Sequence, residues 1–232
     1  MGQAEVGRIF GIPIVIDGTF LLLALLFGFN HFTSGSTAGI SYGVVLVTGV
    51  ALSILLHELG HAAAARFYGV GTAAIELNGL GGLCHFARPL PLDRITNIVV
   101  LLAGPAANLF LWYFFAFAAT AAIDNGVDGP VDINRTAMLL LQLSEINQML
   151  LVFNLLPAHP LDGGRALAQI LSFGITYGRA MRVVAVFGFV IAAMLALSAI
   201  TSGIFIALMA WVIFQANLEV WKAYQGNGWR RW

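Results

Sequence analysis

Apolar residues run in six long stretches along this 232-residue chain. A helix needs about 20 apolar residues to cross the roughly 30 Å hydrocarbon core of a bilayer. All the stretches approach or exceed that length except the first, which is shorter. The pattern predicts an all-α polytopic membrane protein with about six transmembrane helices. The expected spans cover about 18–31, 41–68, 94–123, 135–156, 180–200 and 203–223.

Two segments outside these stretches have β character. Residues 7–17, GRIFGIPIVID, alternate and carry β-branched side chains, which predicts a short strand or an interfacial piece. Residues 70–93 are rich in glycine, with strand-like sequence before Gly79 and after Gly82. We therefore expect a small β-hairpin or sheet at the cytoplasmic face, between the second and third spans.

Composition and charge agree with a membrane location. Hydrophobic residues make up 59% of the chain and charged residues 9%, far from the balance of a soluble domain. With both termini in the cytoplasm, ten of the 11 Lys and Arg residues fall on the cytoplasmic side and only Arg135 on the other. The positive-inside rule favours this arrangement. We expect an integral protein of a prokaryotic cytoplasmic membrane, in contact with the lipid bilayer and with no nucleic-acid partner.

The domain organisation follows from the spans. We expect one integral-membrane domain over 1–232, with a catalytic core at about 41–172 and accessory spans at about 18–31, 180–200 and 203–223. No cleavable signal peptide and no appended soluble domain are expected. The single cysteine, Cys84, excludes an intramolecular disulfide.

The second span carries a polar cluster, HELGH, at 57–61. Because residues i and i+4 share one helix face, His57 and His61 can bind one zinc together. Glu58 can then take a proton from a water and pass it to a leaving amine. Polar groups at bilayer depth cost at least about 2.5–3.5 kcal/mol each when charged, which indicates a function. The alternative is a hydrogen-bonded cluster that holds helices together.

A third ligand is needed, because a catalytic zinc has three protein ligands. Asp162, in the segment NLLPAHPLDGGRAL at 154–167, follows a span that runs toward the same membrane face as the HELGH span. His159 is the alternative ligand. Pro157, Pro160 and two glycines predict a non-helical segment that lines a water-filled cavity. Asn154 can hold a substrate carbonyl or cap its helix.

Several further polar residues have no predicted catalytic role. Cys84 and His85 are adjacent and can bind metal, but a buried thiol and an interfacial histidine are the simpler interpretation. His31 is expected at an interface. Glu145 lies mid-span in the fourth helix, where we expect it to be hydrogen-bonded inside the bundle, although a functional role stays open.

Three motifs in order resemble the site-2 protease family of intramembrane zinc metalloproteases. HELGH at 57–61 corresponds to the family's HExxH, AGPAAN at 103–108 to GPxxN, and NLLPAHPLDGGR at 154–165 to NxxPxxPxDG. The likeness extends from about residue 7 to residue 172. A departure is His159, which stands where similar sequences usually have an apolar residue. We expect no PDZ insertion and no CBS domain within this length.

The resemblance implies one zinc per chain, bound by His57, His61 and Asp162, with Glu58 as general base. It implies that Asn154 helps to hold the substrate. Substrates would be transmembrane segments of other proteins, cut near the cytoplasmic face, often with release of a membrane-tethered regulator. The substrate is expected to add as a strand to the hairpin edge, where it would contact glycines and Leu83. The glycines are Gly79, Gly81 and Gly82.

Two other classes of function stay open at this point. A catalytically silent member would act as a scaffold for membrane proteins, with the same residues in place. A metal or ion transporter would use the intramembrane histidines and aspartate as a permeation site, although the sequence has no obvious inverted repeats. The sequence makes no prediction about the substrate, the cleavage position, the need for a prior cut, the gating spans or the oligomeric state.

Overall fold

The structure is a computed structural model that describes residues 2–79, 81–88, 93–124 and 131–225. The chain divides into two compact units, which are described separately below. The first comprises residues 1–90 and 103–151, and the second comprises residues 91–102 and 152–232. The assignment of 1–232 to one protease domain stays a prediction.

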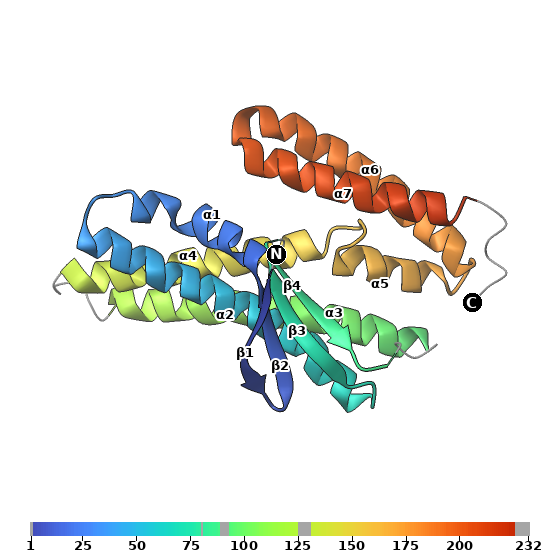
Figure 1. The fold of residues 1–232 in the computed structure, drawn as a ribbon, viewed down its shortest axis with the longest axis horizontal. Helices are drawn as coiled ribbons and strands as arrows, with labels where there is room; N and C mark the ends of the chain where they lie inside the picture. Colours follow the sequence, from blue (N-terminus) through green and yellow to red (C-terminus); the bar gives the residue numbers. More distant parts are fainter. Residues whose placement is uncertain (1, 80, 89–92, 125–130, 226–232) are drawn as a thin grey trace. The chain divides into compact units, whose positions relative to one another are not determined.

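A four-stranded sheet lies in the first unit (Figure 1). Its strands, in spatial order, are β1 (Gln3–Ile9), β2 (Ile12–Asp17), β3 (Thr72–Asn78) and β4 (Gly81–Phe86). The pairs β1–β2 and β3–β4 are antiparallel, and β2–β3 is parallel. The expected hairpin after the second span is therefore confirmed. The open choice for residues 7–17 is resolved in favour of strands, which form a second hairpin.

The helices of the first unit follow and flank the sheet. A 3-10 turn, η1 (Gly18–Phe20), leads into α1 (Leu21–Phe32) and then α2 (Thr37–Phe67). Most of α3 (Arg94–Asp124) and α4 (Val131–Asn154) also belongs to this unit.

Short hydrogen bonds cap the starts of η1 and α3 and connect η1 to the β3–β4 hairpin. The Asp17 carboxylate accepts hydrogen bonds from the Thr19 backbone and hydroxyl, at 2.9 and 2.6 Å. The Thr19 hydroxyl in turn accepts from the backbone N–H of Gly79, at 2.9 Å. At the start of α3, hydrogen bonds from the Thr96 side chain and backbone hold the pKa of the Asp93 carboxyl below its usual range.

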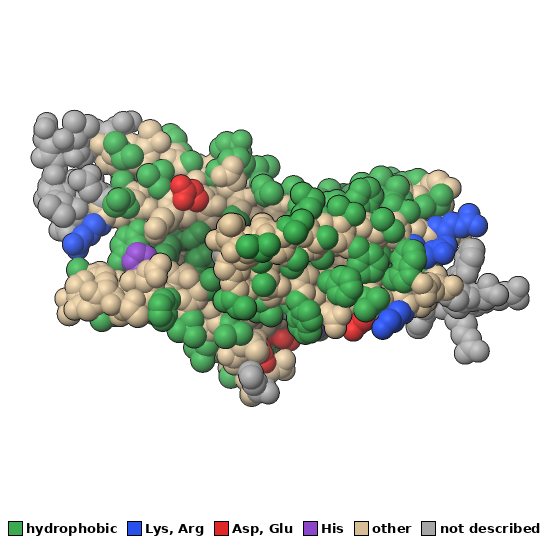
Figure 2. All heavy atoms as spheres, turned by 90° about the horizontal axis from the view of Figure 1, so that it is seen from above, with side chains coloured by type: hydrophobic (Ala, Val, Ile, Leu, Met, Phe, Trp, Pro, Cys, Tyr) green, Lys and Arg blue, Asp and Glu red, His purple; other side chains and the backbone are tan. Residues whose placement is uncertain are grey.

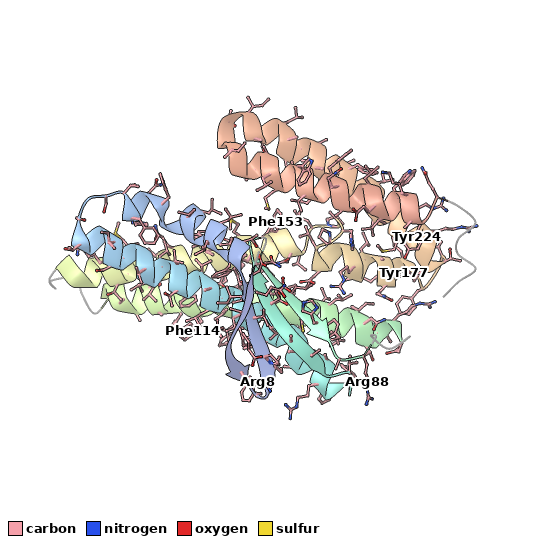
Figure 3. All side chains as sticks on the ribbon, viewed as in Figure 1. Arg8, Arg88, Phe114, Phe153, Tyr177 and Tyr224 are labelled. Carbon is pink, nitrogen blue, oxygen red and sulfur yellow. The ribbon has the colours of Figure 1, made fainter. Side chains whose placement is uncertain are left out.

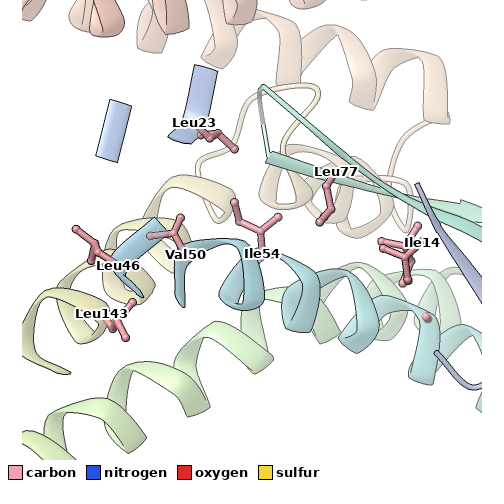
Figure 4. Close-up of a cluster of buried hydrophobic side chains, with 9 residues drawn as sticks. Ile14, Leu23, Leu46, Val50, Ile54, Leu77 and Leu143 are labelled. Atoms are coloured by element: carbon pink, nitrogen blue, oxygen red, sulfur yellow. The ribbon is translucent and has the colours of Figure 1, made fainter. Parts of the chain in front are cut away.

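The core of the first unit joins the sheet to α2. Leu46, Val50 and Ile54 follow one another at four-residue spacing on α2 and are 2–4% exposed. They pack with side chains from the sheet, α1 and α4 (Figure 4). This packing places the next turns of α2, which carry the HELGH motif, directly beneath the sheet. The partners are Ile14, Leu23, Ala62, Ile75, Leu77 and Leu143.

The second unit is built on three helices, α5 (Asp162–Leu171), α6 (Tyr177–Ser202) and α7 (Ile204–Ala223). The two long helices form a hairpin that turns at Gly203, where φ is +92° and a side chain would be strained. Tyr177 and Tyr224 meet near the open end of this hairpin, with ring centroids 6.5 Å apart (Figure 3).

One prediction about this unit is wrong. The segment with Pro157, Pro160, Gly163 and Gly164 was expected to be non-helical throughout, but α5 begins at Asp162 and includes both glycines. The prolines precede the helix, where they lie in turns. The glycines are tolerated in the helix because they pack against backbone, as described for the site below.

The membrane assignment is supported in its coarser form. Four helices among the described residues are long and apolar enough to cross a bilayer, within α2, α3, α4 and α6. Helix α1 has 12 residues, which is about 18 Å and short of a bilayer core. Hydrophobic side chains cover much of the face in Figure 2, as expected for a surface that meets lipid. The count of six spans stays a prediction.

Candidate metal centre

The HELGH motif lies on one buried stretch of α2. His57, Glu58 and His61 are each 5% exposed. The Nε2 atoms of the two histidines are 3.1 Å apart. Two imidazole ligands of a tetrahedral zinc, each with a Zn–N distance of about 2.0–2.1 Å, would have their nitrogens about 3.3 Å apart. The pair is therefore spaced to bind one zinc ion.

Gly104 on α3 leaves the space that such an ion needs. A Cβ atom built at Gly104 would overlap the Nε2 atoms of both His57 and His61. A Cβ at Gly60 would similarly overlap the backbone oxygen of Ala103, so α2 and α3 approach closely at this point. The two small residues create a cradle beside the metal-binding nitrogens, and the side chains present fit zinc.

A chain of side-chain hydrogen bonds orients His57. Its Nδ1 is 2.5 Å from Oδ1 of Asn108, so this ring nitrogen donates and Nε2 is left as the metal-binding atom. Asn108 Nδ2 donates to Asn147 Oδ1 at 3.0 Å, and Asn147 Nδ2 donates to the Ser53 hydroxyl at 3.0 Å. All three supporting residues are at most 1% exposed. The chain thus fixes the tautomer and rotation of one candidate ligand.

The Glu58 side chain lies against the sheet. A Cβ built at Gly82 on β4 would overlap the Glu58 carboxylate. Glycine at this position therefore lets the strand pass directly over the candidate general base. The other hairpin residues singled out from the sequence are placed differently.

Gly79 packs on η1, since its N–H bonds Thr19 and a Cβ there would overlap the Thr19 backbone. Gly81 follows the turn with φ +131°, and Leu83 is 44% exposed on β4.

Asp162 and Asn154 both belong to the second unit. Asp162 is the first residue of α5 and is 7% exposed. Cβ atoms at Gly163 and Gly164 would overlap the backbone of Leu155 and Ala158, so the first turn of α5 packs tightly on the segment before it. Asn154 is the last residue of α4 and is half-buried.

Comparison with known proteins identifies the family. The sequence profile of peptidase family M50 matches residues 45–197, more than half of the chain. Zinc metalloprotease MJ0392 of Methanocaldococcus jannaschii is 31% identical over 215 residues, covering 91% of this chain and 59% of that protein. The solved structure of a site-2 protease from the same organism matches with a TM-score of 0.68 and 28% identity, over 94% of each chain. The chain belongs to peptidase family M50.

Other M50 relatives agree over shorter stretches. Stage IV sporulation protein FB of Bacillus subtilis is 33% identical over 135 residues, covering 56% of this chain and 42% of that protein. The chain spans 59% of the length of the M. jannaschii metalloprotease. The resemblance to site-2 proteases is confirmed, and zinc is the cofactor of this family of metalloproteases.

Sequence reasoning missed part of the M50 site. Asn108 lies in the AGPAAN motif, but its partner His57 is 51 residues away in the chain, and no role was predicted for it. Asn147 and Ser53 were not singled out at all. One signal was available: Ser53 and His57 are four residues apart in an otherwise apolar helix and so share a face.

The remaining sequence candidates have ordinary local partners. His85 lies 3.2 Å from Glu76 across the β3–β4 pair, and Cys84 Sγ lies 3.7 Å from the Thr72 hydroxyl. The His31 ring packs on Tyr42.

Glu145 is exposed at the surface of α4 and lines a cavity of about 510 Å³ with Gln142 and Tyr42. The prediction that Glu145 lies inside the helix bundle is therefore wrong.

Burial holds the pKa of the His159 imidazole below its usual range.

Proposed function

We propose that this chain is an intramembrane zinc endopeptidase that hydrolyses peptide bonds in or near transmembrane segments of other membrane proteins. Cleavage would occur near the cytoplasmic face and release a membrane-tethered regulator. The observation that carries the proposal is the buried HELGH motif, whose Glu58 lies against a β-strand of the same unit. Membership of a family of zinc metalloproteases agrees with it.

The proposed zinc ligands are His57, His61 and Asp162, with one zinc per chain. His57 and His61 lie in the first unit and Asp162 in the second, and the resemblance to the family's motifs is what assigns all three to one zinc. The 3.1 Å spacing of the histidine nitrogens and the cradle at Gly104 support the first two assignments. The position of Asp162 at the buried start of α5, within the third family motif, supports the last.

Glu58 acts as general acid and base in this proposal. When bound, zinc would polarise the peptide carbonyl as a Lewis acid and would lower the pKa of water. Glu58 takes a proton from the attacking water while the water oxygen forms a bond to the carbonyl carbon. It then gives that proton to the nitrogen as the C–N bond breaks. Glu58 is only 5% exposed, which limits the access of other water to the carboxylate.

Substrate positioning is assigned to β4 and Asn154. A transmembrane helix must unwind before its peptide bonds are accessible, and an extended chain can add to β4, one of the two edge strands of the described sheet. Gly81, Gly82 and Leu83 would face such a strand near Glu58, whereas Gly79 supports the turn. Asn154 would donate its amide to the substrate carbonyl.

The finer topology is also a proposal. Six spans with both termini in the cytoplasm agree with the bias of ten cations against one. A prokaryotic cytoplasmic membrane suits this arrangement. Substrates are membrane proteins, and the lipid bilayer is the solvent of the apolar helix surfaces.

The test uses the full chain purified in detergent with a reporter fused to transmembrane segments. The variant Glu58→Gln should keep one zinc per chain and lose cleavage, because the amide cannot accept the proton. Glu219→Gln makes the same chemical change on an exposed side chain of α7 and should cleave normally. Undiminished cleavage by Glu58→Gln would contradict the proposal.

A second measurement tests the ligand set without any substrate. Zinc should be counted in the wild type, His57→Ala and Asp162→Ala. About one zinc in the wild type, lost from both variants, would support the three-ligand site. Zinc retained by Asp162→Ala would move the third ligand to His159.

A further inference from the structure

The turn segment between α4 and α5 is held by few hydrogen bonds of its own. The N–H groups of Leu156, Ala158 and Leu161 donate to carbonyls within Phe153–Ala158, at 2.8–3.1 Å. Pro157 and Pro160 have no N–H to donate. The peptide groups on either side of His159 therefore depend on a partner from elsewhere in the chain.

That partner is Asn217 on α7, 58 residues away. Its Oδ1 accepts from the His159 backbone N–H at 3.2 Å, and its Nδ2 donates to the His159 carbonyl at 2.6 Å. The second hydrogen of Nδ2 goes to the Ile213 carbonyl at 2.7 Å. The side-chain amide thus satisfies both backbone groups of one residue and uses all its own donors.

The surroundings of Asn217 hold this amide in one place. Asn217 is fully buried, and a Cβ built at Gly188 on α6 would overlap its amide group. Buried Ala158, Ala192 and Ile213 pack together next to it, with Phe153 and Leu161 at their edge. Figure 3 labels Phe153 at the end of α4. In such a dry setting a hydrogen bond is strong and a lost one leaves unpaired polar groups.

The segment that Asn217 holds leads directly to Asp162. Gly163 and Gly164 pack against the backbone of Leu155 and Ala158, and the Arg165 N–H donates to the Leu161 carbonyl at 3.1 Å. These contacts connect the His159 peptide closely to the first turn of α5. A shift at His159 must move the residue that begins that turn.

We infer that Asn217 is a positioning residue for the zinc ligand Asp162, so that the last helix belongs to the metal centre instead of serving only as an accessory span. The inference rests on the proposed ligand role of Asp162. It predicts that a change at Asn217 on α7, or at Gly188 on α6, weakens zinc binding. A purely structural role for Asn217 would lower stability equally with and without zinc.

The experiment compares zinc affinity by competition with a chromophoric chelator, on the full chain in detergent. Asn217→Ala should bind zinc at least about 10-fold more weakly, in the range found when supports of metal ligands are removed. Gln215→Ala removes an exposed amide from the same helix and should leave the affinity unchanged. Gly188→Ala should cause the same loss of zinc affinity, because its methyl group would displace the amide while residue 217 stays asparagine.

Thermal unfolding with and without zinc separates positioning from stability. Zinc should raise Tm less in Asn217→Ala than in the wild type. Wild-type zinc affinity in folded Asn217→Ala would overturn the inference, as would equal losses of Tm in both states. If Asn217→Ala does not fold, wild-type affinity in Gly188→Ala overturns it. If Asp162→Ala keeps full affinity, the ligand assignment fails first and the inference with it.

Discussion

His57 and Asp162 are held in position by different means. His57 lies on a 31-residue helix, which fixes its spacing to His61 without further help, and only the rotation of its ring needs support. Side-chain amides give that support, through Asn108 and Asn147. Asp162 follows a turn segment whose backbone is fixed by glycine contacts and by Asn217.

The difference shows what each kind of scaffold leaves undetermined. A regular helix sets the distance between two ligands but not the direction of a flat ring. A turn segment sets neither, so its peptide groups must be held before its side chain has a defined place. Substitutions at the two regions should therefore fail in different ways.

The largest effect is expected at Gly104. Gly104→Ala places a methyl group on both metal-binding nitrogens and should reduce bound zinc to less than about a tenth of the wild-type content. Helix propensity improves in this variant, so the loss cannot come from a weaker α3. Metal analysis after gel filtration measures it, and Ala106→Val on the exposed face of α3 is the control. Full zinc content in Gly104→Ala would show that the cradle is not the metal's place.

Removing the ring support should weaken zinc binding without abolishing it. Asn108→Ala should reduce zinc affinity by about 10–100-fold, because His57 then loses its fixed tautomer and rotation. Asn108→Asp still accepts a hydrogen bond from Nδ1 but loses the donor to Asn147 Oδ1, so it should recover only part of the loss. Chelator competition measures both variants. Equal affinities in the wild type and Asn108→Ala would mean that packing alone orients the ring.

At the start of α5, which packs on the turn segment, the same size of change should also lower stability. Gly163→Ala drives a methyl group into the Leu155 backbone, which cannot rotate away, and should reduce the free energy of unfolding by about 1–3 kcal/mol. Gly174→Ala, where a Cβ meets only ordinary contact, serves as the control. Denaturant titration by circular dichroism gives the difference. A neutral Gly163→Ala would break the contrast between the two regions.

The smallest effect is expected at the far end of the hydrogen-bond chain. Ser53→Ala removes the acceptor of Asn147 Nδ2, but that amide still donates to the Leu143 carbonyl at 2.8 Å. The loss should be about 0.5–1.5 kcal/mol in stability, with little change in zinc affinity. The same thermal and chelator measurements apply. A zinc defect as large as that of Asn108→Ala would mean that the chain acts as one unit.

The elements that could be predicted are those with a strong local signal. The β3–β4 hairpin was predicted because glycines at 79, 81 and 82 mark a turn between two short strand-like runs. The β1–β2 segment stayed open, since a short alternating stretch also suits an interfacial piece. Its strand character is decided by pairing with β3, whose paired residues lie 61 positions later in the chain.

The missed features depend on contacts between distant segments. Gly163 and Gly164 were interpreted as helix breakers, yet they are helical because only glycine permits the approach to Leu155 and Ala158. The HELGH residues were identifiable from four-residue spacing alone. Asn108 was part of the AGPAAN motif but was given no role, and Asn217 was not singled out, because their partners lie 51 and 58 residues away.

The parallel pairing of β2 with β3 has a mechanical consequence. These strands enter and leave the α1–α2 hairpin side by side, at Ile14–Ile16 and Ile75–Leu77. Both ends of that helical hairpin are thus joined to the same sheet, and the Thr19–Gly79 hydrogen bond is a second connection between them. We therefore expect any displacement of α1 to be transmitted through β2 and β3 to β4, the strand that passes over Glu58.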